Sequence, residues 1–269
     1  MIAVMSQAKH DEVVVIGFGV VGRATASVLD CLHHAYDPAA GFDASTMSQP
    51  VRTAIVCTPC ADGWIDCFEE LDLFGPQEIL VRSTVLPEAI VQLAERFPSA
   101  WVAHWPEWLT EGSASADAAN PDKVVLGVMD GDLARGDRRM RELCGQRWPV
   151  PSIVVDARAS TLAKIGVNSM YATKVWLFNV LYEAAGDDRT YSELCSVIAM
   201  DQRIHLSHAR PWSGGYMGFG GKCISKDLGF LGLLAGEQLD ADVIEQLQFA
   251  NAHRVEATKV AVPAPFEGE

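Results

Sequence analysis

The sequence predicts an α/β protein: a Rossmann-type doubly wound parallel sheet followed by an all-helical domain. Three observations support this prediction. Short β-branched runs alternate with helical patterns in the first half, a glycine-rich loop follows the first run, and helical patterns dominate the second half. We expect residues 1–155 to form the first domain and residues 156–262 the second. Residues 263–269, rich in proline and acidic side chains, are expected to be a disordered tail.

The β-branched runs of the first half are expected to be strands. Where such runs alternate with helical patterns, βαβ units with parallel strands are the usual result. A short additional strand is expected at the sequence AYD, which ends at Asp37. The runs are EVVVIG, TAIVCTP, EILVRST, WVAHW, KVVLGV and PSIVVD, and the clearest helical patterns between them are VVGRATASVLDCL and PEAIVQLAERF.

The second half is expected to be helical. A long helix is predicted from about residue 160 to residue 185, where Gly186 ends the pattern. Apolar residues form a wide stripe along this helix, which indicates a face buried in a core or in a dimer interface. After Asp201 the chain becomes irregular and glycine-rich, and two further helices are predicted over about 225–235 and 240–260.

The composition limits the possible functions. The chain has 269 residues, of which 49% are hydrophobic, and a formal net charge of −14. Nucleic acids and anionic membranes bind basic surfaces, so we expect neither as a partner. Seven scattered cysteines do not indicate a disulfide framework, and no apolar stretch is long enough for a membrane span. The start of the chain does not resemble a signal peptide, so we expect a cytoplasmic protein.

A glycine fingerprint predicts a dinucleotide site. In VVVIGFGVVG, the GxGxxG spacing of Gly17, Gly19 and Gly22 directly follows a strand and precedes a helix. Such glycines allow a tight turn and the close approach of a pyrophosphate to the helix N-terminus. The alternative is that they serve only strand-to-helix packing. The residues expected to contact the cofactor here are Gly17, Phe18, Gly19, Val20, Val21 and Gly22.

Asp37 strengthens this prediction and selects the cofactor. It ends the expected second strand twenty residues after Gly17, where a carboxylate accepts hydrogen bonds from both ribose hydroxyls. A carboxylate at this position would repel a 2′-phosphate, and no arginine follows it before Arg52. We therefore expect NAD rather than NADP.

The sequence GFGGKCISKD indicates a reactive thiol at Cys223. Lys222 and Lys226 flank the cysteine, and a helix is expected to begin at about Ser225; both an ammonium group and a helix N-terminus lower the pKa of a thiol. The adjacent glycines would let a substrate come close, and Asp227 is a candidate acid or base. The alternative is a buried cysteine in a glycine turn. Combined with nicotinamide, a thiolate could trap an aldehyde as a thiohemiacetal, which is oxidised to a thioester and hydrolysed to a carboxylate.

GFGGKCISKD also resembles the GFGGxCxxKD signature of the UDP-glucose/GDP-mannose dehydrogenase family. Other landmarks of that family follow in the same order, over roughly residues 12–255: GFGVVG, VCTP, RSTV, WPEWLTEGSA, NPDKVVLG and LAKIGVNSMYATKV. The cysteine signature and the WPEWLTEG stretch are specific, whereas the glycine fingerprint is not. The resemblance implies a twofold, NAD-dependent oxidation of the C6 alcohol of a nucleotide sugar to a carboxylate, and a homodimer formed through the helical domain.

The resemblance further implies roles for individual residues. Cys223 would be the nucleophile, Asp227 would assist proton transfer, and Lys164 and Asn168, four residues apart on one helix face, would stabilise the oxyanion and orient a water molecule. A lysine inside an apolar helical stretch does need a partner or a ligand, because burying an unpaired ammonium is costly. The alternative is a Lys164 side chain that extends to solvent.

Further residues are implied in hydrolysis and binding. Glu107 would be the base for thioester hydrolysis, and Thr84 would lie between nicotinamide and substrate. Besides the glycine loop and Asp37, the cofactor would contact Thr58, Pro59, Ser83, Thr84 and Glu111. The substrate would contact Glu107, Trp108, Leu109, Lys164, Asn168, Arg210, Gly220 and Gly221. Arg210 is one of several cations before the glycine-rich loop that would bind a phosphate or remain solvated.

Several alternatives stay open at this point. Family members usually continue for roughly 100 to 150 residues beyond the end of this chain, in a second α/β unit. The chain is therefore a shortened enzyme with another substrate, one half of a two-chain protein, or a fragment. A dehydrogenase that stops at the aldehyde and a degenerate NAD-binding scaffold are the alternative functions. The CxxC spacing of Cys57 and Cys60 has no second pair, so no metal site is expected. His104 is expected to be structural.

Overall fold

A mostly parallel, seven-stranded sheet forms the first part of the computed structural model, which describes residues 13–29, 34–43, 50–129, 131–144, 150–236 and 239–259. The predicted tail over 263–269 lies outside the described residues. The chain divides into two compact units, Met1–Lys164 and Ile165–Glu269. This division falls inside the long helix α7 (Ala157–Ala185) and not before it.

The strands of unit 1 are ordered β2-β1-β3-β4-β5-β6-β7. Strands β1 to β5 are parallel, β6 is antiparallel to β5, and β7 is parallel to β6. The predicted α/β class is confirmed, although the two last strands run against the other five. Their bounds are β1 (Val13–Ile16), β2 (Ala35–Tyr36), β3 (Thr53–Val56), β4 (Glu78–Val81), β5 (Trp101–His104), β6 (Val124–Val128) and β7 (Ser152–Asp156).

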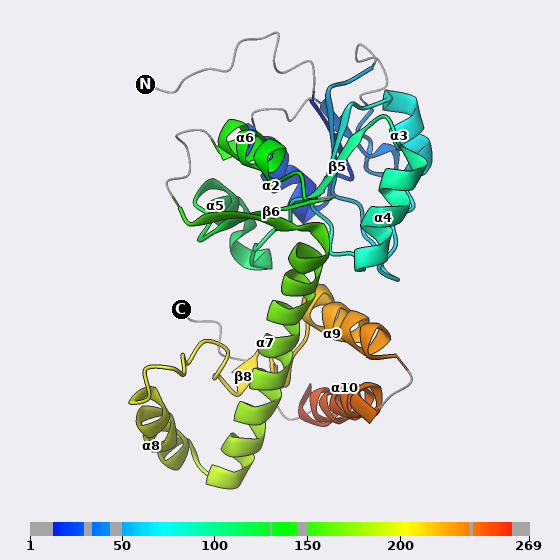
Figure 1. Cartoon of the computed structure of the whole chain (residues 1–269). Coiled ribbons are helices and arrows are strands. Elements are labelled where there is room, and N and C mark those ends of the chain that lie inside the picture. Colours follow the sequence, from blue (N-terminus) through cyan, green and yellow to red (C-terminus); the bar gives the residue numbers. More distant parts are fainter. Residues whose placement is uncertain are drawn as a thin grey trace. The chain divides into compact units, whose positions relative to one another are not determined.

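Helices cover both faces of this sheet, with α3 and α4 on one side and α2, α5 and α6 on the other (Figure 1). Alternate strand residues point to opposite faces, so Val14 packs in the cluster that contains Phe74 and Leu93, whereas Val15 packs with Met140. Every residue of β3 and β4 is buried, as expected for central strands covered on both faces. The helices are α2 (Val20–Leu29), α3 (Phe68–Phe74), α4 (Pro87–Arg96), α5 (Ala114–Ala119) and α6 (Leu133–Cys144).

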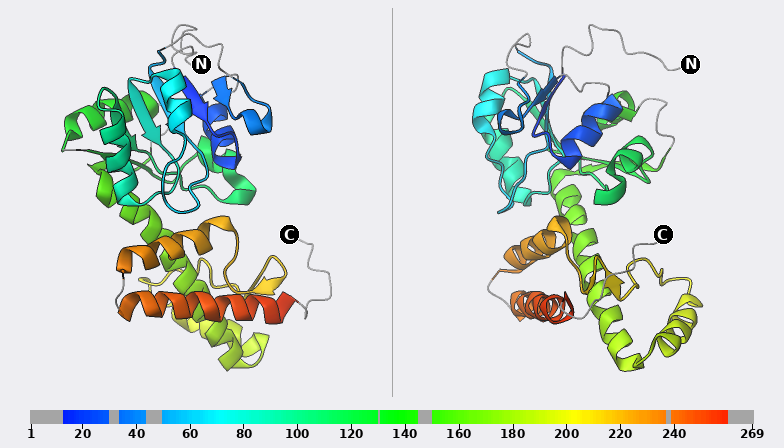
Figure 2. Two further views of the ribbon diagram at one scale, coloured as in Figure 1. Left: turned by 90° about the vertical axis from the view of Figure 1, so that its right-hand side faces the viewer. Right: turned by 180° about the vertical axis from the view of Figure 1, so that it is seen from behind.

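Unit 2 is helical. It contains most of α7, then α8 (Asp188–Ala199), α9 (Lys222–Ala235) and α10 (Leu239–Lys259), with a short hairpin of β8 (Trp212–Ser213) and β9 (Tyr216–Met217) before α9 (Figure 2). Gly186 takes a left-handed conformation with φ of 78° at the end of α7, where the sequence predicts the helix to stop. One cluster of buried side chains joins α7 to α9 and α10, and contains Ala172, Val175, Phe219 and Leu228, with Ile244 and Leu247 packed against it.

Candidate active site

The three fingerprint glycines have different steric surroundings at the end of β1. A Cβ atom on Gly22 would lie 2.0 Å from the carbonyl oxygen of Gly17, and one on Gly17 would lie 2.8 Å from the backbone of Cys57. Gly17 also has a φ of 86°, which disfavours other residues. Around Gly19, by contrast, the described chain places no atom within 4 Å of that position. Gly17 and Gly22 therefore allow the turn and its packing, whereas the space beside Gly19 is open to a ligand.

Asp37 lies against this glycine loop. Its Oδ2 accepts a hydrogen bond of 2.9 Å from the backbone N–H of Phe18, and its Oδ1 accepts one of 3.2 Å from that of Ala40. Phe18 is buried and packs on Phe42, with 4.2 Å between the ring centroids, while Arg23 stacks over both rings. Asp37 thus fixes the loop conformation as well as presenting a carboxylate beside it.

The loops after β3 and β4 lie next to the glycine loop along the sheet edge. Ser83 donates a hydrogen bond of 2.6 Å to the carbonyl oxygen of Thr58, which joins the two loops. Thr84 is buried, Thr58 is half-buried and Pro59 is exposed. Val20 is exposed and Val21 half-buried at the start of α2. The side chain of Glu111 lies outside the described residues.

A buried ion pair joins Lys164 and Glu107. Lys164 Nζ lies 2.9 Å from Glu107 Oε1, and the two side chains are 4% and 8% exposed. Glu107 Oε2 accepts a hydrogen bond of 2.6 Å from the backbone N–H of Leu109. Lys164 also lies 5.3 Å from the centroid of the Trp108 ring. The alternative of a Lys164 side chain extended to solvent is therefore wrong, because a carboxylate supplies the partner that its burial requires.

His104 is structural. It is fully buried, and its Nδ1 lies 2.8 Å from Ser160 Oγ on the first part of α7. Burial lowers its pKa from 6.5 to about 3, because an imidazolium loses its hydration there. The neutral ring therefore fastens β5 to α7. The thiols of Cys57 and Cys60 are buried as well, and no cluster of potential metal ligands occurs among the described residues.

In unit 2, three of the predicted catalytic residues lie together. Asn168 Nδ2 donates a hydrogen bond of 2.6 Å to Asp227 Oδ2, and Asp227 is completely buried. Cys223 is the second residue of α9, one helical turn before Asp227, and is exposed. Lys226 Nζ lies 3.5 Å from Asp227 Oδ1. An exposed thiol at a helix N-terminus, one turn from a buried carboxylate, is suited to covalent catalysis.

The glycine-rich loop before Cys223 is held by Asn251, which sequence reasoning did not identify. Asn251 Oδ1 accepts a hydrogen bond from the backbone N–H of Phe219, and its Nδ2 donates one to the carbonyl oxygen of Phe219, each 2.8 Å long. The Tyr216 hydroxyl occupies the space beside Gly220, whereas no described atom lies within 4 Å of a Cβ atom on Gly221. Of these two glycines, Gly221 is therefore the one that leaves room for a close ligand among the described residues.

The cations that precede this loop face solvent. Arg210 and Arg203 are exposed, and Arg203 pairs with Asp201 at 2.6 Å. The segment itself is held against α7, because Asn179 Nδ2 donates a hydrogen bond of 2.9 Å to the carbonyl oxygen of Pro211. Arg210 stays a prediction as a substrate contact.

The sheet and the glycine loop give this chain a fold of the Rossmann type. A UDP-glucose dehydrogenase from Pyrobaculum islandicum is similar, with a TM-score of 0.68 and 21% identity over 93% of this chain and 70% of that chain. At this level of identity the likeness shows the fold. No described helix is both long and apolar enough to cross a membrane.

Relatives of higher sequence identity are UDP-glucose 6-dehydrogenases. Residues 158–253 match the central domain of the UDP-glucose/GDP-mannose dehydrogenase family. The chain is 32% identical over 186 residues to a UDP-glucose 6-dehydrogenase of Rickettsia conorii, covering 65% of this chain and 40% of that protein. It is 34% identical over 131 residues to the UDP-glucose 6-dehydrogenase of Mus musculus, and the match covers 46% of this chain and 25% of that protein. The chain is thus similar to the UDP-glucose/GDP-mannose dehydrogenase family over these residues, and it spans less than half the length of these two relatives.

Proposed function

We propose that this chain acts in an NAD-dependent oxidation of a primary alcohol, on a sugar or nucleotide sugar, to a carboxylate through a covalent intermediate on Cys223. The observation that carries this proposal is the cluster of an exposed thiol at the start of α9, the buried Asp227 and its hydrogen bond from Asn168. UDP-glucose is the first substrate to test, because the relatives are named UDP-glucose 6-dehydrogenases.

The cofactor site fits a dinucleotide. Gly19 leaves open space at the N-terminal end of α2, and Asp37 presents a carboxylate beside the same loop. Phe18, Val20, Val21, Thr58, Pro59, Ser83 and Glu111 complete the proposed set around Gly17, Gly19 and Gly22. When bound, NAD would accept the hydrides that leave the substrate carbon in the two oxidation steps.

The residues of this chain would perform the covalent steps. The thiolate of Cys223 adds to the aldehyde carbon and forms a thiohemiacetal; its oxidation leaves a thioester on the same sulfur. Lys164 stabilises the oxyanion by its positive charge, and Asn168 orients the attacking water. Glu107 accepts a proton from this water as the C–S bond breaks, and Asp227 assists the return of a proton to the thiolate. Overall, an alcohol, water and two NAD⁺ give a carboxylate, two NADH and three protons.

Substrate contacts and assembly are part of the same proposal. Trp108, Leu109, Arg210, Gly220 and Gly221 would contact the sugar or its phosphate, and Thr84 would lie between nicotinamide and substrate. A homodimer through the helical unit is supported by large apolar side chains that are exposed in the described part of this unit: Met170, Leu177, Val243 and Phe249. A cytoplasmic location stays a prediction.

Replacing Cys223 by serine tests the covalent role. With UDP-glucose and NAD, Cys223→Ser should lower the rate of carboxylate formation at least about a thousandfold, since a neutral hydroxyl is a much weaker nucleophile than a thiolate. Chromatography of the sugar acid and absorbance of NADH measure this. Cys195→Ser, on α8, is the matched control and should keep most of the activity. If the wild-type chain and Cys223→Ser form NADH at the same rate and neither forms the sugar acid, the chain is a dehydrogenase that stops at the aldehyde. NAD binding without activity toward any sugar in the wild-type chain would point to a scaffold.

A further inference from the structure

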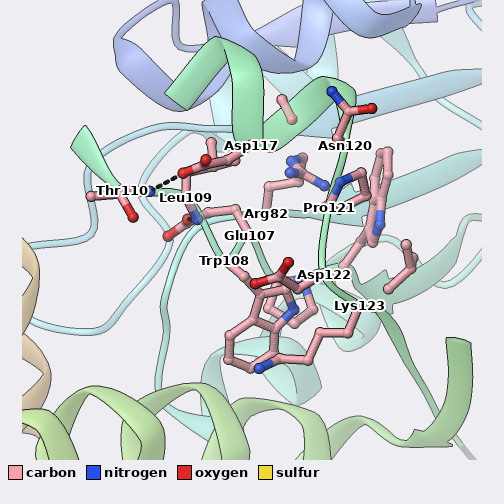
Figure 3. Close-up of a pocket in the computed structure, with 14 residues that line it drawn as sticks. Arg82, Glu107, Trp108, Leu109, Thr110, Asp117, Asn120, Pro121, Asp122 and Lys123 are labelled. Carbon is pink, nitrogen blue, oxygen red and sulfur yellow. Dashed lines mark hydrogen bonds between the residues drawn. The ribbon is translucent and has the colours of Figure 1, made fainter. Parts of the chain in front are cut away.

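A pocket of unit 1 contains buried hydrogen-bond donors that have no acceptor among the described residues. It lies between the loop after β5, helix α5 and the segment that leads into β6 (Figure 3). Arg82, Glu107, Trp108 and Lys123 are among the residues that line it. Buried donors are almost always paired in folded proteins, so two orphan donors in one pocket need an explanation.

Arg82 is the first orphan donor. It is the residue after β4 and only 7% exposed, and its guanidinium stacks on the Trp105 ring at 4.2 Å from the centroid. Its Nε has no hydrogen-bond partner among the described residues. Glu107 does not accept a hydrogen bond from this Nε; its two oxygens bind Lys164 Nζ and the N–H of Leu109. A buried N–H donor without an acceptor costs folding free energy, and burial also lowers the pKa of Arg82.

Trp108 is the second orphan donor. Its indole Nε1 is buried and has no acceptor within the described part of the chain. Lys123 adds a second cation, with Nζ at 4.1 Å from the centroid of the Trp108 ring. Of the three acidic residues in the lining, Glu107 is paired with Lys164, Asp122 is exposed, and Asp117 accepts hydrogen bonds from Thr110 and Ser113 through one oxygen. The unmet demand in this pocket is therefore for a hydrogen-bond acceptor that carries negative charge.

We propose that this pocket is an oxyanion site that binds the carboxylate or phosphate group of a small molecule, held by Arg82 and the indole N–H of Trp108, with Lys123 adding positive charge. A planar guanidinium suits both groups, because it donates parallel hydrogen bonds to two oxygens of one ligand. Anion binding to this pocket can be measured without an alcohol substrate. A failure of this proposal can therefore be distinguished from a failure of the proposed oxidation.

Thermal unfolding in different anions tests the site and identifies the ligand group. The probes are sodium acetate, phosphate and pyrophosphate, and NAD in a separate arm, each compared with sodium chloride at equal ionic strength. A ligand present at about a hundred times its Kd should raise the Tm by about 5 to 10 °C. A higher Tm in acetate indicates a carboxylate ligand. A higher Tm in phosphate or pyrophosphate indicates a free phosphate group. A higher Tm in NAD alone indicates the pyrophosphate of the cofactor. No rise in any arm overturns the proposal.

Two substitutions separate ligand binding from structure. Arg82→Met keeps the aliphatic length but removes the cation, so it should abolish the anion-dependent rise in Tm while the Tm in chloride stays equal or increases. Trp108→Phe removes the indole N–H together with part of the ring and should weaken anion binding about tenfold. The exposed Arg96→Met and the partly exposed Trp64→Phe are the matched controls, which should keep the full rise. An undiminished rise in both pocket variants, or a lower Tm of Arg82→Met in chloride, contradicts the proposed role.

Discussion

At the scale of single residues, buried charges decide how the site is built. Lys164 interrupts an apolar helical stretch, and this alone predicts a partner or a ligand, because water is absent there. The partner is Glu107, which lies far from Lys164 in the sequence but 2.9 Å away in the fold. The proposed hydrolysis uses both members of this pair, Glu107 as the base and Lys164 as the cation.

Removing one member of this pair should be costly. Glu107→Gln leaves the Lys164 ammonium buried without a charge partner and should lower the free energy of unfolding by about 3 to 5 kcal/mol. The double variant Lys164→Met with Glu107→Leu should be less destabilised than either single variant. Denaturant titration measures all three. The exposed pair of Arg96 and Asp72 is the control, where Arg96→Gln should change stability by less than about 1 kcal/mol. Equal losses at both pairs would contradict a buried ion pair.

Sequence patterns identify the candidate site residues that belong to motifs, but not the residues that support them. Asp37 and Cys223 lie at fixed spacings from glycines, so their chemistry can be anticipated from the chain alone. Arg82 stands in a motif, yet only its burial and missing acceptor distinguish it from a solvated arginine. Asn251 lies in an ordinary helical pattern, and its two hydrogen bonds to Phe219 depend on tertiary packing.

At the scale of elements, the glycine loop separates packing from ligand binding. Gly22→Ala would place a Cβ atom 2.0 Å from the Gly17 carbonyl oxygen and should lower the free energy of unfolding by about 1 to 3 kcal/mol. Gly19→Ala meets no described atom and should change stability by less than about 1 kcal/mol, but weaken NAD binding at least about tenfold, because the methyl group occupies the space of the pyrophosphate. Denaturant titration and calorimetry measure the two effects. Unchanged NAD affinity in Gly19→Ala would contradict the cofactor site.

The contact between β5 and α7 should make stability depend on pH. His104 is neutral in the folded chain, where burial lowers its pKa to about 3, but it binds a proton below about pH 6.5 when unfolded. The unfolded state therefore gains protons as the pH falls from about 6.5 toward 3, and stability decreases. The stability of wild type relative to His104→Asn should drop by about 2 kcal/mol between pH 8 and pH 5, in denaturant titrations. Parallel pH curves would mean that His104 is not neutral and buried.

The elements themselves were predictable where the pattern is strong. Central strands are continuous apolar runs, and the long helix ends at Gly186 as its sequence predicts. The direction of β6 was not predictable, because an apolar run has the same pattern in either direction. The short hairpin of β8 and β9 has only two residues in each strand, which is too little for an alternating pattern.

At the scale of the whole chain, the proposed function is divided between two units. Unit 1 holds the glycine loop, the pair of Lys164 and Glu107 and the oxyanion pocket, while unit 2 holds Cys223, Asp227 and Asn168. The helix α7 belongs to both units and carries Lys164 and Asn168 one turn apart. The sequence predicts a domain boundary between residues 155 and 156, where the last strand ends and this helix begins. In the structure the first turns of α7 pack against β5 and β6, and they therefore belong to unit 1.

The yield of NADH for each carboxylate formed tests the central claim most directly. The wild-type chain is supplied with a limiting amount of UDP-glucose and excess NAD, NADH is measured by its absorbance, and the sugar acid by mass spectrometry. Oxidation through a thioester on Cys223 predicts two NADH for each acid and a gain of about fourteen mass units in the sugar, since a CH2OH group becomes COOH. One NADH for each aldehyde, with no acid formed, would contradict the covalent route.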